Sequence, residues 1–320
     1  MRVAFLGNGA FGIPTFQALA RSPHEIISLV TRPDTAAGRG RKQTATALKP
    51  VAEEYDVPIM EIEDLRAPDT LERLAGIEAL LWVVVAFPII PSELLTIPSA
   101  GVVNLHASLL PRYRGAAPIQ WAIINGETTT GVTTFFIDAG IDTGGICLQR
   151  KVGIEPDENA EALSLRLADT GARLMLETVD LIAAGSAPRV PQDTTLATPA
   201  PSFTRKDGRI DWEMAAEDIG NRIRGLHPWP GSYSTIRGER LLVLKARVTT
   251  GRELPWDEET HPAPGTLAGF LSDGAPVIST GDGKGVVLLE IQREGRRPGD
   301  AVAVMRGMRC EAGERFGDDG

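Results

Sequence analysis

The sequence predicts an α/β fold, with a Rossmann-like, mostly parallel sheet in an N-terminal domain and a smaller, OB-like β-barrel in a C-terminal domain. In the first half of the chain, short apolar runs alternate with segments of helical periodicity, the pattern of a parallel sheet covered by helices. In the last third, short β-rich runs follow one another between Gly, Pro and Asp turns, as in small barrels.

The predicted N-terminal strands are apolar and rich in β-branched residues. Val83–Val85 is a continuous β-branched run, which favours a strand buried on both faces. The expected strands are Arg2–Leu6, Glu25–Val30, Ala79–Phe87, Gly101–His106 and Gly131–Ile137. The expected helices are Gly12–Arg21, Thr44–Tyr55, Leu65–Leu74 and Ala116–Asn125, and then a long helix over Ala160–Ala184 with Gly185 as its C-cap.

A proline-rich segment separates the two predicted domains. Ser186–Phe203 contains four prolines and several small polar residues, a composition typical of linkers. The strands expected beyond it are Ser232–Ile236, Arg240–Val248, Gly265–Phe270, Ala275–Ser279 and Val286–Ile291. We therefore expect domains at residues 1–187 and 207–320, joined by a linker at residues 188–206.

Composition and charge are those of an ordinary globular protein, with 42% hydrophobic and 23% charged residues among 320. The longest apolar run, Ala79–Ile90, is shorter than the roughly 20 residues that span a bilayer. The N-terminus has no secretory leader pattern, and Cys147 and Cys310 lack metal or disulfide spacing. We expect a protein of the reducing cytoplasm with no metal. The net charge of −9 argues against general nucleic-acid binding but allows a local basic patch.

Candidate catalytic residues lie at the end of one predicted strand and in the turn after the next. Asn104 and His106 are two residues apart, so their side chains face the same side of the strand. The Gly-rich stretch 137–145 adds Asp138 and Asp142. An amide, an imidazole and a carboxylate among apolar strands suit proton transfer and stabilisation of an oxyanion. The alternative is a structural polar network, because buried polar groups need partners in any case.

A GxGxxG match over Gly7–Gly12 indicates a second kind of function. In dinucleotide-binding folds this turn holds a pyrophosphate, and an acid about 20 residues further on binds the ribose. Here the second strand ends in Val30-Thr31-Arg32, without such an acid. A dinucleotide-dependent oxidoreductase therefore remains an alternative, and the other interpretation is a tight turn into a helix.

The segment Thr31–Lys49 is basic, with five basic residues against one acid in a chain of net charge −9. Its glycines and small residues fit either a solvated loop or an arm that grips phosphates.

Three motifs together resemble the methionyl-tRNA formyltransferase family. They are PD-x-x-AGRG-x-K from Pro33 to Lys42, NLHASLLPRYRGAAPIQ from Asn104 to Gln120, and DAGIDTGG from Asp138 to Gly145. The resemblance covers nearly the whole chain. It implies transfer of a formyl group from 10-formyltetrahydrofolate, a consumed co-substrate, to the amino group of methionine on initiator tRNA. It further implies catalysis and folate binding in the N-terminal domain and help in tRNA binding from the barrel, with no membrane or stable protein partner.

The resemblance also assigns residues one by one. The family's catalytic Asn, His and Asp fall on Asn104, His106 and Asp142, while Asp138 aligns with a non-catalytic acid. The residues expected to line the folate pocket are Ser108, Leu109, Leu110 and Pro111.

The basic loop corresponds to an inserted loop that enters the tRNA acceptor stem in the family. Arg39 matches its key arginine, and we expect Arg41 and Lys42 to contact tRNA beside it. Trp212 and Trp229 in the C-terminal domain are expected to be core residues. Formyltransferases that act on other amines, such as amino sugar nucleotides, share the Asn-x-His core and remain an alternative.

Overall fold

The computed structural model describes residues 1–37, 42–44, 46–249, 253–256 and 261–317. The chain divides into two compact units. Unit 1 comprises Met1–Pro118, Thr129–Gly153 and Leu163–Pro201, and unit 2 comprises Ile119–Thr128, Ile154–Ala162 and Ser202–Gly320. Within the described residues, no helix is both long enough and apolar enough to cross a membrane.

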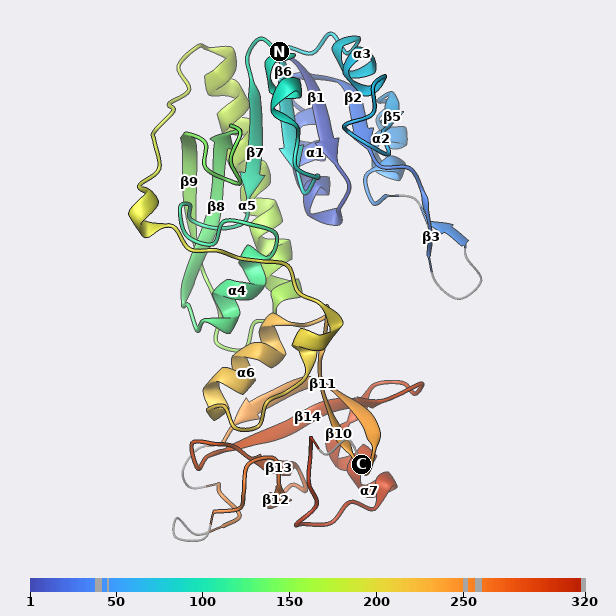
Figure 1. The fold of residues 1–320 in the computed structure, drawn as a ribbon, viewed down its shortest axis with the longest axis vertical. Helices are drawn as coiled ribbons and strands as arrows, with labels where there is room; N and C mark the ends of the chain where they lie inside the picture. The colour runs from blue at the N-terminus through green and yellow to red at the C-terminus, as the bar shows by residue number, and fades with distance from the viewer. Residues whose placement is uncertain (38–41, 45, 250–252, 257–260, 318–320) are drawn as a thin grey trace. The chain divides into compact units, whose positions relative to one another are not determined.

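Unit 1 is built on a seven-stranded sheet of order β5-β2-β1-β6-β7-β8-β9 (Figure 1). The strands are β1 (Arg2–Gly7), β2 (Glu25–Thr31), β5 (Ile59–Glu61), β6 (Leu81–Val85), β7 (Val102–His106), β8 (Thr129–Phe136) and β9 (Ile146–Gly153). The first five in that order run parallel, and β8 runs antiparallel to both of its neighbours, β7 and β9. This confirms the mostly parallel Rossmann-like sheet. The prediction missed β9 because this edge strand is largely polar and exposed.

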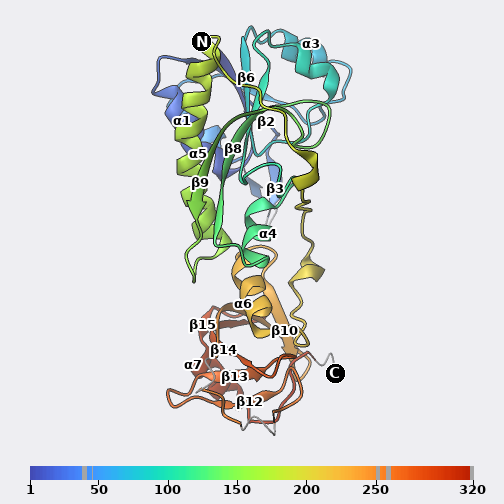
Figure 2. The same ribbon diagram turned by 90° about the vertical axis from the view of Figure 1, so that its left-hand side faces the viewer.

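Helices cover both faces of this sheet, with α1 (Ile13–Ala20) and α5 (Ala160–Ala183) on one face and α3 (Thr70–Ala75) on the other (Figure 2). On the α1 face the rings of Phe5 and Phe16 meet edge to face, with centroids 5.2 Å apart. On the α3 face Leu74 packs in one cluster with Leu6 and Trp82. Both faces of β1 and β6 are therefore buried, which explains their continuous apolar runs. The remaining helices of this half are α2 (Lys49–Glu54) and α4 (Pro118–Ile124).

The basic segment contains a short antiparallel hairpin of β3 (Thr35–Ala37) and β4 (Lys42–Thr44), where the sequence pattern predicts no strand. As a result the helix expected from Thr44 begins later, at Lys49.

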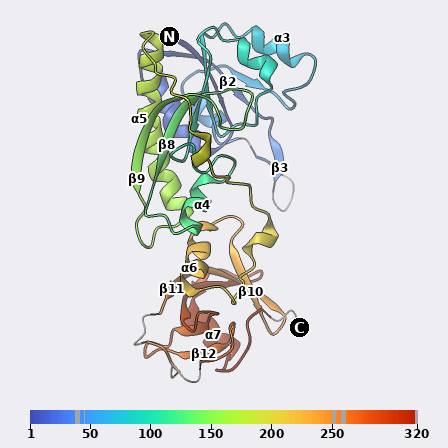
Figure 3. The same cartoon turned by 60° about the vertical axis from the view of Figure 1, so that its left-hand side comes forward.

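Unit 2 contains an antiparallel sheet of order β10-β11-β14-β13-β12, with β15 beside β14. Its strands are β10 (Ser232–Ile236), β11 (Glu239–Val248), β12 (Leu267–Phe270), β13 (Pro276–Ser279), β14 (Gly285–Arg293) and β15 (Gly299–Asp300). The pattern did not predict two helices of this unit. One is α6 (Ala216–Gly225), which packs on β11 (Figure 3), and the other is α7 (Ala301–Met308), which packs on β14.

The C-terminal segment joins the two edges of this sheet. Phe316 bridges to Ile236 at the end of β10, and Arg315 bridges to Thr266 just before β12. The Phe316 ring also meets buried Trp212 edge to face, with centroids 5.9 Å apart. The sheet therefore closes through residues 315–316, which confirms the predicted barrel.

The proline-rich segment is extended and lies against the sheet of unit 1 as far as Pro201. Val190 exchanges two backbone hydrogen bonds with Ile146, of 2.8 and 2.9 Å. Arg189 places its guanidinium 3.7 Å from the centroid of the Phe136 ring. Proline favours this extended conformation, so the same composition that is typical of linkers also suits a strand-like strap. We call residues 189–200 the strap.

Candidate active site

The candidate site lies at the carboxyl end of β7, in the interior of the unit 1 sheet. Open α/β sheets bind their ligands at this end of the strands. Asn104 pairs with Val84 of β6 and Phe135 of β8, and His106 pairs with Thr133 of β8. The alternation of a strand puts both site residues on one face, as the spacing predicts.

Asn104 and His106 differ in how their polar groups are used. Asn104 is half-buried, and its side-chain amide forms no hydrogen bond with any residue that the structure describes. Both amide N–H groups are therefore available to a substrate atom.

His106 is only 6% exposed and is held by a backbone carbonyl. Its Nε2 lies 2.8 Å from the carbonyl oxygen of Tyr113. Because a carbonyl can only accept, Nε2 carries the proton and Nδ1 is the free nitrogen of the neutral ring. Burial lowers the pKa of His106, although the Asp142 carboxylate and the Tyr113 carbonyl oppose this effect. The imidazole is thus neutral at neutral pH and can accept a proton at Nδ1.

Asp142 lies on the Nδ1 side of this imidazole. Its Oδ2 is 3.6 Å from His106 Nδ1, longer than an ordinary hydrogen bond. The same oxygen accepts a hydrogen bond of 2.8 Å from the Gly115 N–H, which fixes the carboxylate in place. Asp142 itself has a left-handed backbone, with φ of 53°. The ring orientation therefore comes from Tyr113, and Asp142 supplies negative charge next to the free nitrogen.

Asp138, the other acid of this turn, has a local task. Its Oδ1 accepts from Gly140 N at 3.0 Å and from Thr143 Oγ1 at 2.5 Å. Such short-range bonds from an Asp side chain close a turn on itself. Asp138 therefore stabilises the turn that carries Asp142.

Tyr113 and Gly115 were missed by reasoning from the sequence, because each acts through its backbone and side-chain type gives no signal for that. Both have positive φ, of 60° and 124°. A Cβ added at Gly115 would lie 2.7 Å from the carbonyl oxygen of Ala200, so this position requires glycine.

The residues expected to line the folate pocket form a tightly held loop after β7. Ser108 Oγ donates to the Arg112 carbonyl at 2.6 Å, and the Ser108 carbonyl accepts from Thr133 Oγ1 at 2.6 Å. Leu110 N donates to the same Thr133 hydroxyl at 3.1 Å. Ser108 and Leu110 are buried, and only Leu109 and Pro111 keep partly exposed side chains. The first pair fixes the loop, and the second pair provides surface beside the site.

The expected tRNA contacts lie in the basic segment, where Arg39 and Arg41 fall outside the described residues and Lys42 begins β4. Lys49, at the base of the hairpin, is buried and pairs with Asp34 and Glu61. Burial opposes its charge, but the hydrogen bonds that its ammonium donates to these two carboxylates outweigh that effect and raise the pKa of Lys49. Lys49 is therefore a structural cation, unavailable to a phosphate.

The GxGxxG stretch is accounted for by packing. A Cβ at Gly7 would lie 2.7 Å from Leu48 Cδ1 and 3.0 Å from the Val85 carbonyl oxygen. Asn8 Oδ1 accepts from Thr31 Oγ1 at 3.0 Å and from Arg32 N at 2.9 Å. Packing thus requires glycine at Gly7, whereas a Cβ at Gly9 or Gly12 would make ordinary contacts, and the Asn8 bonds support the interpretation as a tight turn into a helix.

Neither a reactive thiol nor a metal site is found among the described residues outside this site. Burial raises the pKa of the Cys147 thiol, which disfavours the nucleophilic thiolate. Among the described residues, no cluster of three or more His, Cys, Asp or Glu side chains could hold a metal ion.

The two tryptophans of unit 2 have different environments. Trp212 is buried and donates to Ser234 Oγ at 3.0 Å, as a core residue should. Trp229 is 53% exposed, with the Arg205 guanidinium 5.8 Å from its ring centroid. The prediction of a core role was wrong for Trp229, because its two proline neighbours place it in a turn rather than in a strand.

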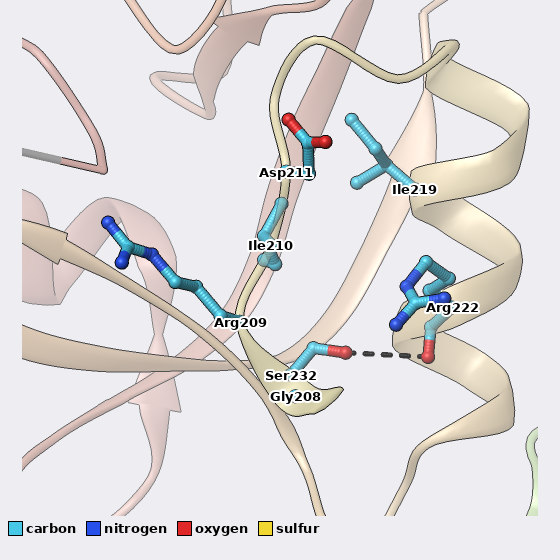
Figure 4. Close-up of a pocket in the computed structure, with 7 residues that line it drawn as sticks. All are labelled: Gly208, Arg209, Ile210, Asp211, Ile219, Arg222 and Ser232. Carbon is cyan, nitrogen blue, oxygen red and sulfur yellow. Dashed lines mark hydrogen bonds between the residues drawn. The ribbon is translucent and has the colours of Figure 1, made fainter. Parts of the chain in front are cut away.

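Two arginines of unit 2, Arg209 and Arg222, donate hydrogen bonds to backbone carbonyls of the same unit. Arg209 Nη2 donates to the Gly317 carbonyl at 2.9 Å, and Arg222 Nη2 donates to the Asp207 carbonyl at 2.8 Å. Figure 4 shows these two side chains on opposite sides of Ile210. The hollow between them does not admit a molecule of the size of water, so it has no room for a ligand.

Comparisons with known proteins agree over both units. The family model described as "Formyl transferase" matches residues 1–179, and that described as "Formyl transferase, C-terminal domain" matches residues 203–309. A protein of Solibacter usitatus named methionyl-tRNA formyltransferase is 42% identical over 319 residues, covering 99% of both chains. One of the same name from Geobacter sulfurreducens is 40% identical over 324 residues, covering 100% of this chain and 98% of its own.

Solved structures support the same fold at lower identity. The crystal structure of WlaRD, a sugar 3N-formyl transferase solved with dTDP and 5-N-formyl-THF, superposes with a TM-score of 0.65. It is 17% identical and covers 93% of this chain and 99% of its own.

Proposed function

This chain belongs to the formyl transferase family, and we propose that it transfers the formyl group of 10-formyltetrahydrofolate to the α-amino group of methionyl initiator tRNA. The folate is a co-substrate that is consumed in each turnover. The observation that carries the chemistry is at the end of β7, where Asn104 faces the same side of the strand as the neutral imidazole of His106, and the Asp142 carboxylate lies beside that imidazole.

The reaction moves one formyl group between two nitrogens. The amine attacks the formyl carbon, a C–N bond forms, and electrons move onto the formyl oxygen. The bond from carbon to N10 of the folate then breaks, the attacking nitrogen loses a proton and N10 gains one. No covalent enzyme intermediate is needed for this exchange.

Asn104 has the right chemistry for the developing oxyanion. Its amide N–H groups are uncommitted among the described residues, and it faces the same side of β7 as His106. Single donors of this kind contribute about 10²–10³ in kcat when they act on an oxyanion.

His106 and Asp142 have the right chemistry for the proton. In the proposed mechanism, His106 Nδ1 accepts the proton that the amine loses, and the Asp142 carboxylate stabilises the imidazolium that results. The Tyr113 carbonyl keeps Nε2 protonated throughout, so that Nδ1 remains the reactive nitrogen. The same proton can then pass to N10, directly or through water.

The remaining assignments concern the two substrates. We propose that unit 1 carries catalysis and the folate site, with Leu109 and Pro111 contributing surface to the loop 108–111. We propose further that Arg39, Arg41 and Lys42 contact the acceptor stem and that unit 2 helps to hold the tRNA. A cytoplasmic location fits these substrates.

The acceptor is tested by transfer of labelled formyl from 10-formyltetrahydrofolate to methionyl initiator tRNA, with free methionine and an amino sugar nucleotide in parallel. We expect label on the tRNA alone. Label on the sugar nucleotide alone would overturn the proposed acceptor while keeping formyl transfer, and label on none of the three would overturn formyl transfer itself.

A further inference from the structure

We propose that Gln192, in the strap, is a positioning residue that fixes the turn carrying Asp142 against His106. This inference rests on the proposed function for its catalytic consequence. Its structural basis is independent of that function and lies entirely within unit 1.

The Gln192 amide is fully used in four hydrogen bonds. Its Nε2 donates to the carbonyls of Asp142 and Gly144, at 2.8 and 2.9 Å. Its Oε1 accepts from Arg114 Nε and Nη2, at 3.1 and 2.7 Å. Two N–H donors and two oxygen lone pairs are the whole capacity of a primary amide. A half-buried side chain saturated in this way has one well-defined orientation.

These four bonds tie together the two segments that supply the partners of His106. Arg114 lies between Tyr113, whose carbonyl accepts from His106 Nε2, and Gly115, whose N–H binds the Asp142 carboxylate. Gln192 therefore joins the segment that orients the imidazole to the turn that carries the acid. It touches no reacting atom and acts through Asp142.

The strap is itself anchored on both sides of Gln192. On one side Val190 pairs with Ile146 in two backbone bonds. On the other, Thr198 Oγ1 accepts from Tyr113 N at 2.8 Å, and Ala200 N donates to the Arg114 carbonyl at 2.6 Å. Gln192 thus projects from a fixed backbone, which is what a positioning side chain requires.

The Asp142 turn needs such support. A non-glycine residue in the left-handed region is strained and persists only where its surroundings hold it. Asp138 closes the turn from within, through Gly140 and Thr143. Gln192 binds the same turn from outside, at the carbonyl of Asp142 itself. Loss of the two Gln192 bonds removes this support from the carbonyls of Asp142 and Gly144, so that the bond from Gly115 N to the Asp142 carboxylate is left to hold the acid in place.

The test uses Gln192→Met and Gln192→Glu in the full-length protein. Gln192→Met keeps the length of the side chain and removes all four bonds. Gln192→Glu keeps the acceptor for Arg114, and with it the attachment of the strap, but removes both N–H donors. Leu196→Ala, at a strap residue that is 59% exposed, is the matched control.

We expect both Gln192 variants to lower kcat about 10- to 100-fold, the scale of a displacement of about 1 Å in a catalytic group. The KM values for the formyl donor and for tRNA should change less than about 3-fold, because the substrates themselves are not contacted. Leu196→Ala should match the wild type. Wild-type kcat in Gln192→Glu, or a rise in KM at constant kcat, would overturn the proposal, whether or not Gln192→Met folds.

Hydrogen exchange separates this proposal from the proposed function. Amides of residues 138–145 should exchange faster in both Gln192 variants than in the wild type, even if the protein forms no formylated product. Unchanged exchange in this turn would overturn the positioning role. An inactive wild type with faster exchange in the variants would overturn the function and leave the strap's role standing.

Discussion

At the scale of single residues, the site depends on which polar groups are occupied and which are free. His106 is held by a backbone carbonyl, Asp142 by a backbone N–H and a glutamine, and Asn104 has no partner among the described residues. Buried polar groups without partners are costly, so a half-buried free amide in an otherwise satisfied site points to a substrate atom.

Asn104→Ala should lower kcat about 10²–10³-fold, because it removes the donor that we propose for the oxyanion. The free energy of unfolding should change by less than about 1 kcal/mol, since the amide satisfies no other described residue. Steady-state kinetics and urea denaturation of the same preparation give both values. A stable variant with wild-type kcat would remove Asn104 from the mechanism.

The lowered pKa of His106 predicts a pH dependence of stability. Burial depresses this pKa in the folded state below the value of 6.5 expected for an unfolded chain. As the pH falls through 6.5, the unfolded chain binds a proton first, so the free energy of unfolding declines; above 6.5 the group has no effect. Urea denaturation from about pH 5 to pH 8 should show this decline.

His106→Gln is the control for that dependence, because glutamine does not titrate. The decline in the free energy of unfolding below pH 6.5 should be smaller in this variant than in the wild type. Parallel curves for the two proteins would show that His106 is not buried as a neutral ring.

At the scale of elements, the basic segment Thr31–Lys49 combines residues expected to bind tRNA with a lysine, Lys49, that stabilises the fold. The segment Thr31–Lys49 has five basic residues, but Lys49 is paired with Asp34 and Glu61 under the hairpin. We therefore expect the contacts to phosphates to come from the arginines of the loop, and Lys49 to hold the loop's base.

Arg39→Ala should weaken tRNA binding and reduce the slope of log K against log salt by about 1, with folate binding nearly unchanged. Lys49→Met should lower the free energy of unfolding by about 1 kcal/mol, because it breaks ion pairs with two partly exposed carboxylates. In Lys49→Met, the slope of log K for tRNA binding against log salt should equal that of the wild type. Equal loss of tRNA and folate binding in Arg39→Ala would indicate misfolding rather than a lost contact.

The elements also show what the sequence pattern could and could not predict. Continuous apolar runs predicted β1, β6 and β7 close to their observed bounds, because strands buried on both faces carry an unambiguous signal. The edge strand β9 was missed because most of its residues are polar or exposed. Helix α6 was missed although Ala216, Ile219 and Ile223 carry a helical spacing, because the β-rich surroundings led to a prediction of strands alone. The hairpin β3–β4 is too short for any period to show.

The candidate site, too, could be predicted from the sequence only in part. Side-chain chemistry and a two-residue spacing were enough to select Asn104 and His106, and the structure places both on one face of β7. The partners that hold them are a carbonyl of Tyr113, an N–H of Gly115 and an amide from a segment typical of linkers. Backbone groups have no residue-type signature, and contacts between residues 50 apart follow only from the fold.

At the scale of the whole molecule, two family models and relatives of 40% and 42% identity place the chain in the formyl transferase family from end to end. The C-terminal segment has a structural role, since residues 315–316 close the barrel of unit 2. The net charge of −9 leaves contact with an anionic tRNA to local basic groups rather than to the overall field.

We propose that Asn104, His106 and Asp142 together carry out the transfer of formyl to methionyl initiator tRNA. The most direct test is a single-turnover time course of labelled formyl transfer from 10-formyltetrahydrofolate, comparing the wild type with a folded Asp142→Asn variant. We predict label on the methionine α-amine with the wild type and a rate about 10²–10⁴-fold lower with Asp142→Asn. Equal rates would contradict the acid–base assignment, and an unlabelled tRNA with the wild type would contradict the function.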